Sequence, residues 1–389
     1  MIKNVIIFSS MFFFIFSAYS DEIFSNYKKY DLTKTKFKLN VVTKELDQPW
    51  ALTFIDNNNL VITEKSGGVY KVDIRTGKKQ VIKHGIQHIG YDGESVGYSQ
   101  GGLLDAYFNS ADGLIYFTYS HDFKEIMLGK KLSKASSTAI ARGKLVGNEI
   151  KELKVLLIAK PKQQSNKHFG SRISIKDGML FASFGERDKG MIAQDPTKHP
   201  GSIIRIKTNG DIPKDNPKFM GKNAWLPEIY TIGVRNPQGM TISPHDGEVY
   251  FSNHGPRGGD YIGKAKPLAN YGWKDIAWGG TEYSGFSIGD TPFKKEYDMP
   301  VKTWVPSMAI SSIQFYQGEE FPEWQGDLIV SSLYGQSLIR LDYENNVIVG
   351  EEIIFRDKIG RIRDFEIGIK GNIYIVSDSP RSYLWKLSK

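Results

Sequence analysis

The feature that most constrains the fold is a short pattern that recurs six times along the chain. Each copy is a turn residue followed by a run of β-branched and aromatic residues, which is typical of a strand. The copies occupy residues 59–63, 113–117, 178–182, 247–251, 326–330 and 371–375, so successive copies begin roughly 45 to 80 residues apart. This constant strand with variable spacing indicates one structural unit repeated with loops of different length.

Several copies are followed by a second strand, at residues 69–73, 203–206, 338–341 and 383–387, and each such pair predicts a β-hairpin. No long segment repeats its apolar residues with the helical period, so the crossover helices of a parallel α/β protein are missing. We therefore predict an all-β fold, a six-bladed β-propeller whose blades are four-stranded antiparallel sheets. A β-sandwich is the alternative architecture.

No proline-rich or charged linker divides the chain, so we predict one propeller domain over residues 21–389. The last blade of such a ring needs a strand to close it. Residues 37–44 could provide that strand, which would leave the two termini close together.

Residues 1–20 are predicted to be a signal peptide rather than part of the fold. Lys3 precedes an apolar stretch at 5–16 that is too short to span a bilayer comfortably, and Ala18, Tyr19 and Ser20 resemble a cleavage site. Whether this segment is removed or kept as an anchor, the rest of the chain is exported. We expect a periplasmic or secreted protein.

The absence of cysteine excludes disulfides and thiolate metal sites. The formal net charge of +8 is spread over scattered lysines rather than a basic run. Together with export, this argues against nucleic acid as a partner, and we interpret the charge as a solvated surface.

One histidine lies in a setting that suits catalysis. His168 occupies a turn of small residues, and Gly170 has no Cβ, which would leave room for a flat group to approach the ring. Glu186 follows the next hairpin and could return to the imidazole. An acid on one ring nitrogen fixes the tautomer and leaves the other nitrogen as a base. Most histidines in a chain of this length are surface or core residues, so the context carries the hypothesis.

Polar residues elsewhere indicate an anionic, carbonyl-rich ligand. Arg235 and Asn236 precede a proline that restricts the backbone, and an arginine fork suits planar carboxylates. Arg361 and Arg363 are two residues apart, so on a strand they face the same side, which is costly unless an anion or surface acids pair with them. Gln100 stands beside two glycines and is either a ligand donor or an ordinary turn amide.

The loop at 254–260, HGPRGGD, could turn backbone carbonyls inward, because glycine and proline dominate it. Hard cations such as Ca²⁺ accept backbone oxygens, although many glycine-rich loops bind nothing. Together these elements describe a flat ligand with several carboxylates and carbonyls, bound beside a hard cation and facing His168. An acidic quinone cofactor has these properties.

Seven motifs in order give the chain a family resemblance. They are QGGL at 100–103, HFGSR at 168–172, RNPQGM at 235–240, HGPRGGD at 254–260, NYGW at 270–273, FPEW at 321–324 and GRIRD at 360–364. With them the chain resembles the soluble PQQ-dependent aldose sugar dehydrogenases, a branch of the soluble glucose dehydrogenase-like family. The resemblance runs from about residue 46 to the C-terminus.

The resemblance implies a mechanism and a site. His168 would be the general base that takes the proton of the anomeric hydroxyl, Glu186 would position it, and hydride would pass to the C5 carbonyl of PQQ. The residues that would hold the cofactor are Gln100, Arg235, Asn236, Tyr283, Tyr334, Arg361 and Arg363. Gly255 and Pro256 would offer carbonyl oxygens to a calcium ion that bridges protein and PQQ.

The chain departs from the family pattern at several positions. Relatives carry a PQQ-contacting lysine where Tyr334 stands, and a phenol gives a hydrogen bond but no full charge. Relatives have a glutamate at Tyr261, which ligates a second calcium with help from Tyr271, so the departure puts that second metal in doubt. A third difference is Lys167, at a position that faces the sugar in the family and varies there, so it bears on the substrate rather than on the chemistry.

The resemblance implies oxidation of aldoses to lactones, with a quinone or cytochrome as external electron acceptor and a monomer or homodimer as the assembly. Two other functions remain open. One is a propeller that has lost its cofactor and only binds a ligand, for which Tyr334 and Tyr261 are the best support. The other is a metal-dependent propeller lactonase, whose acidic metal ligands the arginine- and glycine-rich loops do not match.

Overall fold

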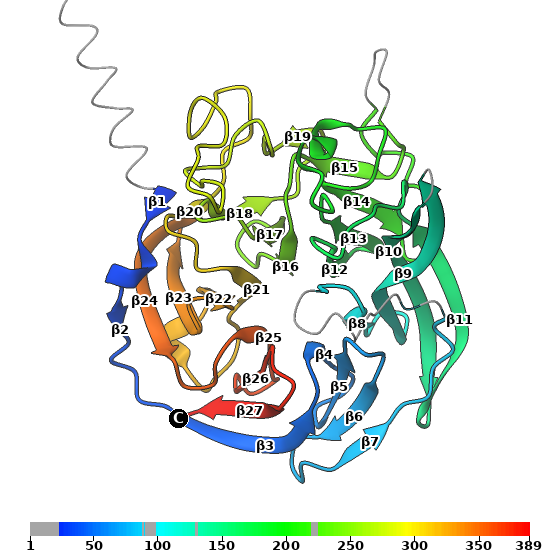
Figure 1. Ribbon diagram of the computed structural model, residues 1–389. Coiled ribbons are helices and arrows are strands. Elements are labelled where there is room, and N and C mark those ends of the chain that lie inside the picture. Colours follow the sequence, from blue (N-terminus) through cyan, green and yellow to red (C-terminus); the bar gives the residue numbers. More distant parts are fainter. Residues whose placement is uncertain (1–22, 88, 90–98, 129–130, 219–224) are drawn as a thin grey trace, which may run out of the picture.

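The computed structural model describes residues 23–87, 89, 99–128, 131–218 and 225–389. The predicted signal peptide lies outside the described residues. Six sheets stand in a ring around a central axis (Figure 1), which confirms the predicted six-bladed β-propeller. Among the described residues, no helix has the length and apolar character needed to cross a membrane.

From the axis outward, the first blade holds β4 (Pro49–Phe54), β5 (Asn59–Glu64), β6 (Val69–Asp73) and β7 (Lys79–Val81). In the same direction, the second holds β8 (Leu103–Asn109), β9 (Leu114–Leu128), β10 (Lys131–Val146) and β11 (Glu149–Ile158). The third holds β12 (Gly170–Lys176), β13 (Met179–Phe184), β14 (Ser202–Lys207), β15 (Ile229–Ile232) and β19 (Ala269–Asn270).

The fourth blade holds β16 (Pro237–Ile242), β17 (Val249–Asn253), β18 (Asp260–Lys264), β20 (Lys302–Trp304) and β1 (Phe24–Ser25). The fifth holds β21 (Ile310–Phe315), β22 (Leu328–Ser332), β23 (Ser337–Glu344), β24 (Val347–Arg356) and β2 (Asp31–Leu32). The sixth holds β25 (Ile362–Ile367), β26 (Ile373–Ser377), β27 (Ser382–Ser388) and β3 (Lys38–Leu46). Short 3₁₀ helices occur at η1 (Tyr27–Lys29), η2 (Gly190–Gln194) and η3 (Pro322–Trp324).

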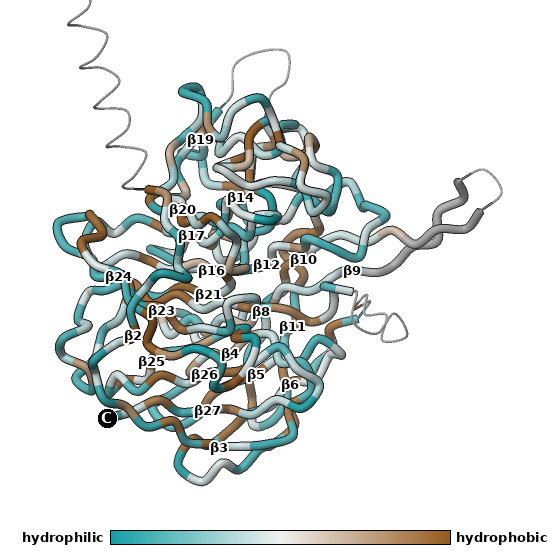
Figure 2. Tube along the Cα trace, turned by 60° about the vertical axis from the view of Figure 1, so that its left-hand side comes forward, coloured by the Kyte–Doolittle hydropathy of each residue, from teal (hydrophilic) through white to brown (hydrophobic). Residues whose placement is uncertain are grey.

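All six copies of the sequence pattern fall on the second strand of a blade, namely β5, β9, β13, β17, β22 and β26. A second strand is covered by a neighbouring blade on each face, so its residues are apolar on both sides rather than alternating. The core between the fourth and fifth blades shows this packing, since Tyr250 and Ile262 of one blade join Val330 and Ile339 of the next in one buried cluster. Figure 2 shows hydrophobic residues along the strands and hydrophilic residues in the outer loops.

The predicted ring closure is confirmed, because β3 pairs antiparallel with β27 and Lys38 lies opposite Ser388. The termini are nevertheless not close together, which corrects the prediction. The described chain begins beside β20, whereas the C-terminus lies beside β3 (Figure 1). Strands β1, β2 and β19 each add a parallel fifth strand to a sheet, so three blades exceed the predicted four strands. These strands are two residues long, too short for a sequence signal.

Candidate functional site

The sequence-predicted site residues gather at one rim of the propeller. Gln100, His168 and Arg235 each come shortly before an innermost strand, whereas Glu186 follows a second strand. Neighbouring strands are antiparallel, so the start of one and the end of the next reach the same rim. The register shows this directly, with Gly170 opposite Phe184, Pro237 opposite Asn253 and Ile362 opposite Ser377.

The centre of the site is a buried imidazole–carboxylate pair. Nδ1 of His168 lies 2.6 Å from Oε1 of Glu186, and the two residues are only 5 % and 1 % exposed. The other oxygen of Glu186 accepts from the backbone N–H groups of Lys189 and Gly190. The carboxylate is therefore fixed, and it selects the tautomer in which Nδ1 carries the proton and Nε2 can act as a base.

The environment keeps His168 neutral. Burial lowers the pKa of its imidazole, and the nearby Arg235 cation lowers it further, against the opposing effect of Glu186. Burial alone would raise the pKa of Glu186, but its hydrogen bond to His168 and the neighbouring charges bring the pKa below its ordinary value. At neutral pH the pair is thus an ionised acid holding an unprotonated imidazole, which is the state a general base needs.

The space beside Gly170 is filled by neighbouring backbone. This corrects the sequence interpretation, in which Gly170 left room for a ligand beside the His168 ring. A Cβ there would lie 2.6 Å from the backbone nitrogen of Gly185 and 2.9 Å from the carbonyl oxygen of Ser183. Gly170 also has a φ of +66°, a conformation that glycine adopts without strain. The residue lets β12 and the end of β13 approach closely, and this places Glu186 beside His168.

The main chain around His168 is held by side chains from other blades. Its N–H donates to Oε1 of Gln100 at 2.8 Å, and the N–H of Gly170 donates to Oδ1 of Asn236 at 3.0 Å. The backbone of His168 has a φ of +52°, which is uncommon for a residue with a side chain. Gln100 and Asn236 thus position the base, and of the two only Gln100 also lines the open pocket of the site.

Arg235 is buried and only partly satisfied. Its Nη1 donates to the carbonyl oxygens of His254 and Gly255 at 2.9 and 3.1 Å, while its Nε has no hydrogen-bond partner among the described residues. Its guanidinium lies 5.4 Å from the ring centroid of Trp273. An unsatisfied buried donor on a cation is costly, so a ligand that accepted from it would be bound favourably.

A cluster of cations shares one acid at the ends of the first and sixth blades. Lys65 Nζ lies 3.2 Å from Oδ1 of Asp378, and Arg363 and Arg361 lie 2.9 and 3.4 Å from Oδ2. Burial alone would raise the pKa of Asp378, but Arg363 and Lys65 outweigh it and hold the pKa well below its usual range. Burial lowers the pKa of Lys65, against the effect of Asp378. Three cations on one carboxylate leave an excess of positive charge.

The two-residue spacing of Arg361 and Arg363 predicted that they need either an anionic ligand or nearby acids, and the structure meets this expectation in part. They do meet an acid, which was one of the two alternatives, but the Asp378 side chain is only 13 % exposed, and its single charge cannot neutralise Lys65, Arg361 and Arg363 together. Arg363 is buried and its Nε finds no hydrogen-bond partner in the part of the chain that the structure describes, whereas nearly half of the Arg361 side chain is exposed. The excess charge is what an anionic ligand requires.

The loop of Gly255 and Pro256 lies at the same rim. Asp260 fixes the loop by accepting from the backbone N–H of Gly255 at 2.6 Å, from Ser307, and from the N–H groups of Met308 and Ala309. Burial raises the pKa of Asp260 to about 6. Asp260 is therefore engaged by the protein, and a cation here would depend on carbonyl oxygens.

Tyr271 does not fit its predicted role as a metal ligand. Its hydroxyl donates to the carbonyl of Lys264 and accepts from the N–H of the same residue, each at 2.8 Å. Its ring stacks on Tyr261 with centroids 5.3 Å apart, and burial raises the pKa of both phenols. Tyr261 and Tyr271 thus form a buried aromatic pair at the place where the resemblance implied a second calcium.

The open part of the site is a pocket of about 540 Å³. Tyr283 and Tyr334, which we expected to line the cofactor, both border it and are 67 % and 65 % exposed. The full lining is Lys28, Gln100, His254, Pro256, Arg257, Tyr283, Pro306, Ser307, Ala309, Tyr334 and Arg361. The Nδ1 atom of His254 is buried and no described residue provides it with a hydrogen-bond partner. The pocket thus combines exposed aromatic rings with cations.

His168, Glu186 and Asp188 lie close enough to resemble a metal site. Their partners argue otherwise. Both oxygens of Glu186 are already used, and Asp188 pairs with Lys167 at 3.2 Å. This group therefore suits proton transfer better than the acidic metal centre of a hydrolase.

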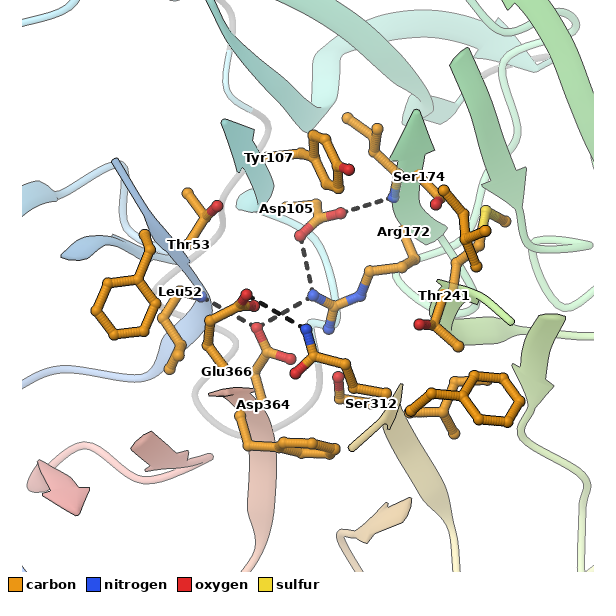
Figure 3. A pocket seen from close by; sticks show the side chains of 18 of the residues that line it. Leu52, Thr53, Asp105, Tyr107, Arg172, Ser174, Thr241, Ser312, Asp364 and Glu366 are labelled. Atoms are coloured by element: carbon orange, nitrogen blue, oxygen red, sulfur yellow. Dashed lines mark hydrogen bonds and ion pairs between the residues drawn. The ribbon is translucent and has the colours of Figure 1, made fainter. Parts of the chain in front are cut away.

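A second cavity of about 480 Å³ lies on the axis and is separate from this rim (Figure 3). Its lining comes from all six innermost strands. Nη1 of Arg172 bridges Asp105 and Asp364 at 2.9 and 3.1 Å, and Glu366 borders the same space. Burial raises the pKa of Asp105 to about 6 and that of Glu366 to about 8. Arg172 is already paired with two of these acids, so the cavity lacks the excess of positive charge that an anionic ligand requires.

Sequence reasoning missed Lys65 and Asp378. Each directly follows the second strand of a blade, Lys65 after β5 and Asp378 after β26. Glu186 has a similar place, two residues after the end of β13. The repeat that identified the blades therefore contained a signal for them: charged residues just after a second strand point to the site rim.

Comparison with known proteins agrees with this geometry. The family model described as glucose/sorbosone dehydrogenase matches residues 46–386. The chain belongs to the glucose/sorbosone dehydrogenase family. This confirms the family expected from the sequence and the class of enzyme, an oxidoreductase of the sugar dehydrogenase type.

Among relatives of this family, the aldose sugar dehydrogenase YliI of Escherichia coli is 32 % identical over 361 residues, which cover 90 % of this chain and 92 % of that protein. The apo crystal structure of the soluble aldose sugar dehydrogenase from Escherichia coli has a TM-score of 0.81 at 30 % identity and covers 91 % of this chain and 99 % of that one. The PQQ-bound aldose sugar dehydrogenase from Streptomyces coelicolor has a TM-score of 0.69 at 20 % identity, covering 91 % of this chain and 99 % of that one, and shares the fold.

Proposed function

We propose that the chain is a PQQ- and calcium-dependent dehydrogenase that oxidises aldoses at the anomeric carbon to lactones. The observation that carries the proposal is the buried His168–Glu186 pair at the same rim as the excess positive charge of Lys65, Arg361 and Arg363. A base and an anion site at one rim are what oxidation by an acidic quinone requires. The family membership and the PQQ bound by the Streptomyces coelicolor enzyme support the same cofactor.

The residues present fit an anionic cofactor with several acceptor groups. Nε of Arg235, Nε of Arg363 and Nδ1 of His254 are buried without a hydrogen-bond partner in the described part of the chain. Native proteins satisfy most buried polar groups, so unpaired nitrogens here suggest that a ligand completes them. Carboxylates and quinone oxygens are suitable acceptors.

When bound, PQQ supplies the two-electron acceptor for the substrate hydride, and the calcium ion polarises that acceptor. His168 accepts the proton of the anomeric hydroxyl at Nε2, while the electron pair of the C–H bond leaves as hydride. Glu186 holds the ring and stabilises the imidazolium that results. Loss of one hydride and one proton converts the cyclic aldose into its lactone.

We assign the calcium ion to the carbonyl oxygens of Gly255 and Pro256. Gly255 O already accepts from Arg235, so a cation there would share this oxygen with the guanidinium or displace it. Because Asp260 is engaged by the backbone, the protein adds no free carboxylate from this loop. Calcium binding should therefore depend on the carboxylates of the cofactor.

We further propose a periplasmic or secreted location, from the leader-like residues 1–20, and an external quinone or cytochrome as the final electron acceptor. The exposed rim, where Tyr283 and Tyr334 stand in the open, suits such an exchange. A monomer or a homodimer is compatible with this function.

The deciding experiment is reconstitution of the apo protein with PQQ and Ca²⁺, followed by a panel of aldoses with a dye acceptor. We expect reduction of PQQ in a single turnover, steady dye reduction, and an aldonolactone as product. EDTA added before reconstitution should prevent activity. Binding of PQQ with no reduction by any aldose would favour the ligand-binding propeller, and hydrolysis of lactones without PQQ would favour the hydrolase.

A further inference from the structure

The segment before the closing strand contributes a residue to the site pocket. This segment lies outside the region matched by the family model, which begins at residue 46. It crosses from the edge of the fourth blade, where Phe24 pairs with Thr303, to the edge of the fifth, where Asp31 pairs with Glu352 (Figure 1). Helix η1 lies between these two contacts and carries Lys28.

The segment is held firmly at η1. Tyr27 is 2 % exposed and belongs to the buried cluster that includes Met308, and a Cβ on Gly335 would lie 2.9 Å from its ring. Its carbonyl oxygen accepts from Nη2 of Arg356 at 3.3 Å. Tyr27 thus anchors the helix against the turn that carries Tyr334, and the next residue is placed at the pocket.

Lys28 lines the pocket together with Tyr334, His254 and Arg361. Within the described part of the chain, its ammonium group has no ion pair and no side-chain hydrogen bond, while Asn26 caps only its backbone N–H. Lys29 follows on the same helix and is also exposed, but it does not line the pocket. An unpaired cation therefore lines the same pocket as Arg361.

We propose that Lys28 binds the anionic cofactor and supplies, from the N-terminal segment, a positive charge to the pocket that Tyr334 also lines. The inference rests on the proposed function, because it needs an anion in this pocket. It assigns to this chain a binding residue from outside the region that the family model matches. Tyr334 can provide a hydrogen bond but no charge. Lys28 and Tyr334 together would therefore give the anion both a hydrogen bond and a positive charge, which a single lysine at 334 could provide alone.

Equilibrium titration of the apo protein with PQQ in the presence of Ca²⁺, followed by quenching of tryptophan fluorescence, tests the proposal. We expect Lys28→Gln to raise the Kd for PQQ about tenfold or more, because a charge-assisted contact is lost. Lys29→Gln is the matched control, one residue away on the same helix, and should stay within about twofold of the wild type. Lys28→Arg should retain most of the affinity.

Two further measurements separate charge from structure. The slope of log Kd against log salt concentration should become shallower in Lys28→Gln and stay unchanged in Lys29→Gln. Tyr334→Lys should restore PQQ affinity to the Lys28→Gln protein, and neither Lys28→Gln nor Lys29→Gln should change Tm, since both side chains are exposed.

The outcomes distinguish this inference from the function on which it rests. If the wild type binds PQQ and Lys28→Gln binds it as tightly as Lys29→Gln does, Lys28 has no part in the site and the inference is overturned alone. If the wild type does not bind PQQ at all, the proposed function fails and the inference fails with it.

Discussion

Nδ1 of His168 lies 2.6 Å from Oε1 of Glu186 in a buried pair that joins the start of β12 to the segment after β13. The pair depends on Gly170 and Gly185, since a Cβ on either would meet backbone within 2.6 Å or less. Two adjacent strands of one blade thus build the base and its orienting acid. The first, fourth and sixth blades supply the positive charge around them through Lys65, Arg235, Arg361 and Arg363.

Replacing His168 with glutamine should lower kcat by roughly 10²-fold or more, because the proton acceptor is lost. PQQ affinity should change little, since cations rather than the imidazole bind the carboxylates. Steady-state dye reduction and a PQQ titration measure the two effects. His245→Gln, in the turn between β16 and β17 at the other rim, is the control. An unchanged kcat in His168→Gln would remove the residue from the mechanism.

The pH dependence of the reaction should follow His168. Burial and Arg235 lower its pKa, so the imidazole stays unprotonated at neutral pH and activity should fall only below about pH 6.5. Glu186 acts in the opposite direction by favouring the imidazolium. Glu186→Gln should therefore move the acidic limb of kcat/KM to lower pH while reducing the plateau value of kcat. A limb that moved to higher pH would contradict this assignment.

Removing a buried cation should weaken cofactor binding more than turnover. Arg363→Ala and Lys65→Met should each raise the Kd for PQQ by about ten- to a hundredfold, the cost of one charge-assisted contact. Single-turnover reduction at saturating PQQ should change much less. Arg381→Ala, an exposed arginine after β26, serves as the control. Wild-type affinity in both variants would show that this cluster is not the anion site.

Asp378 should stabilise the apo protein and oppose the cofactor. It is the acid shared by Lys65 and Arg363, and removing one partner of a buried ion cluster typically costs about 3–5 kcal/mol. We expect Asp378→Asn to lower the apo Tm clearly and to show a larger PQQ-induced rise in Tm than the wild type. The exposed Asp357→Asn should show neither effect. Equal PQQ-induced rises would mean that the anion does not neutralise these cations.

The sequence was sufficient to predict those pairs of site residues that one hairpin, or a two-residue spacing on one strand, brings together. His168 and Glu186 flank one hairpin, and Arg361 and Arg363 are two residues apart, so local reasoning found both pairs. Lys65 and Asp378 are more than three hundred residues apart in the chain, and only ring closure brings them together. No local pattern encodes that contact.

Two other departures have similar physical causes. Gly170 was expected to make room for a ligand, but the contact that requires glycine is with the backbone of the next strand, which only the register reveals. No sequence motif indicates Lys28 as a site residue. Its place in the pocket depends on the two-residue strands β1 and β2, which attach the N-terminal segment to two blades.

The axial cavity in Figure 3 predicts an unusual dependence of stability on pH. Burial, together with the negative charge of Asp364, raises the pKa of Glu366 to about 8, above its value in the unfolded chain. Between about pH 4.5 and pH 8 the folded state therefore binds more protons than the unfolded state. The contribution of Glu366 to the free energy of unfolding is greatest at low pH and declines as pH rises through this window.

Glu366→Gln should remove this contribution, because the neutral amide does not titrate. We expect the variant to lose less stability than the wild type between pH 5 and pH 8, measured by urea unfolding at several pH values. A pKa difference of one unit between the two states corresponds to about 1.4 kcal/mol, so the effect should be measurable even if solvent in the cavity weakens it. The exposed Glu319→Gln is the control. Parallel pH profiles for the wild type and Glu366→Gln would show that Glu366 is ionised in the folded protein, and that the acids of the cavity are solvated rather than held neutral.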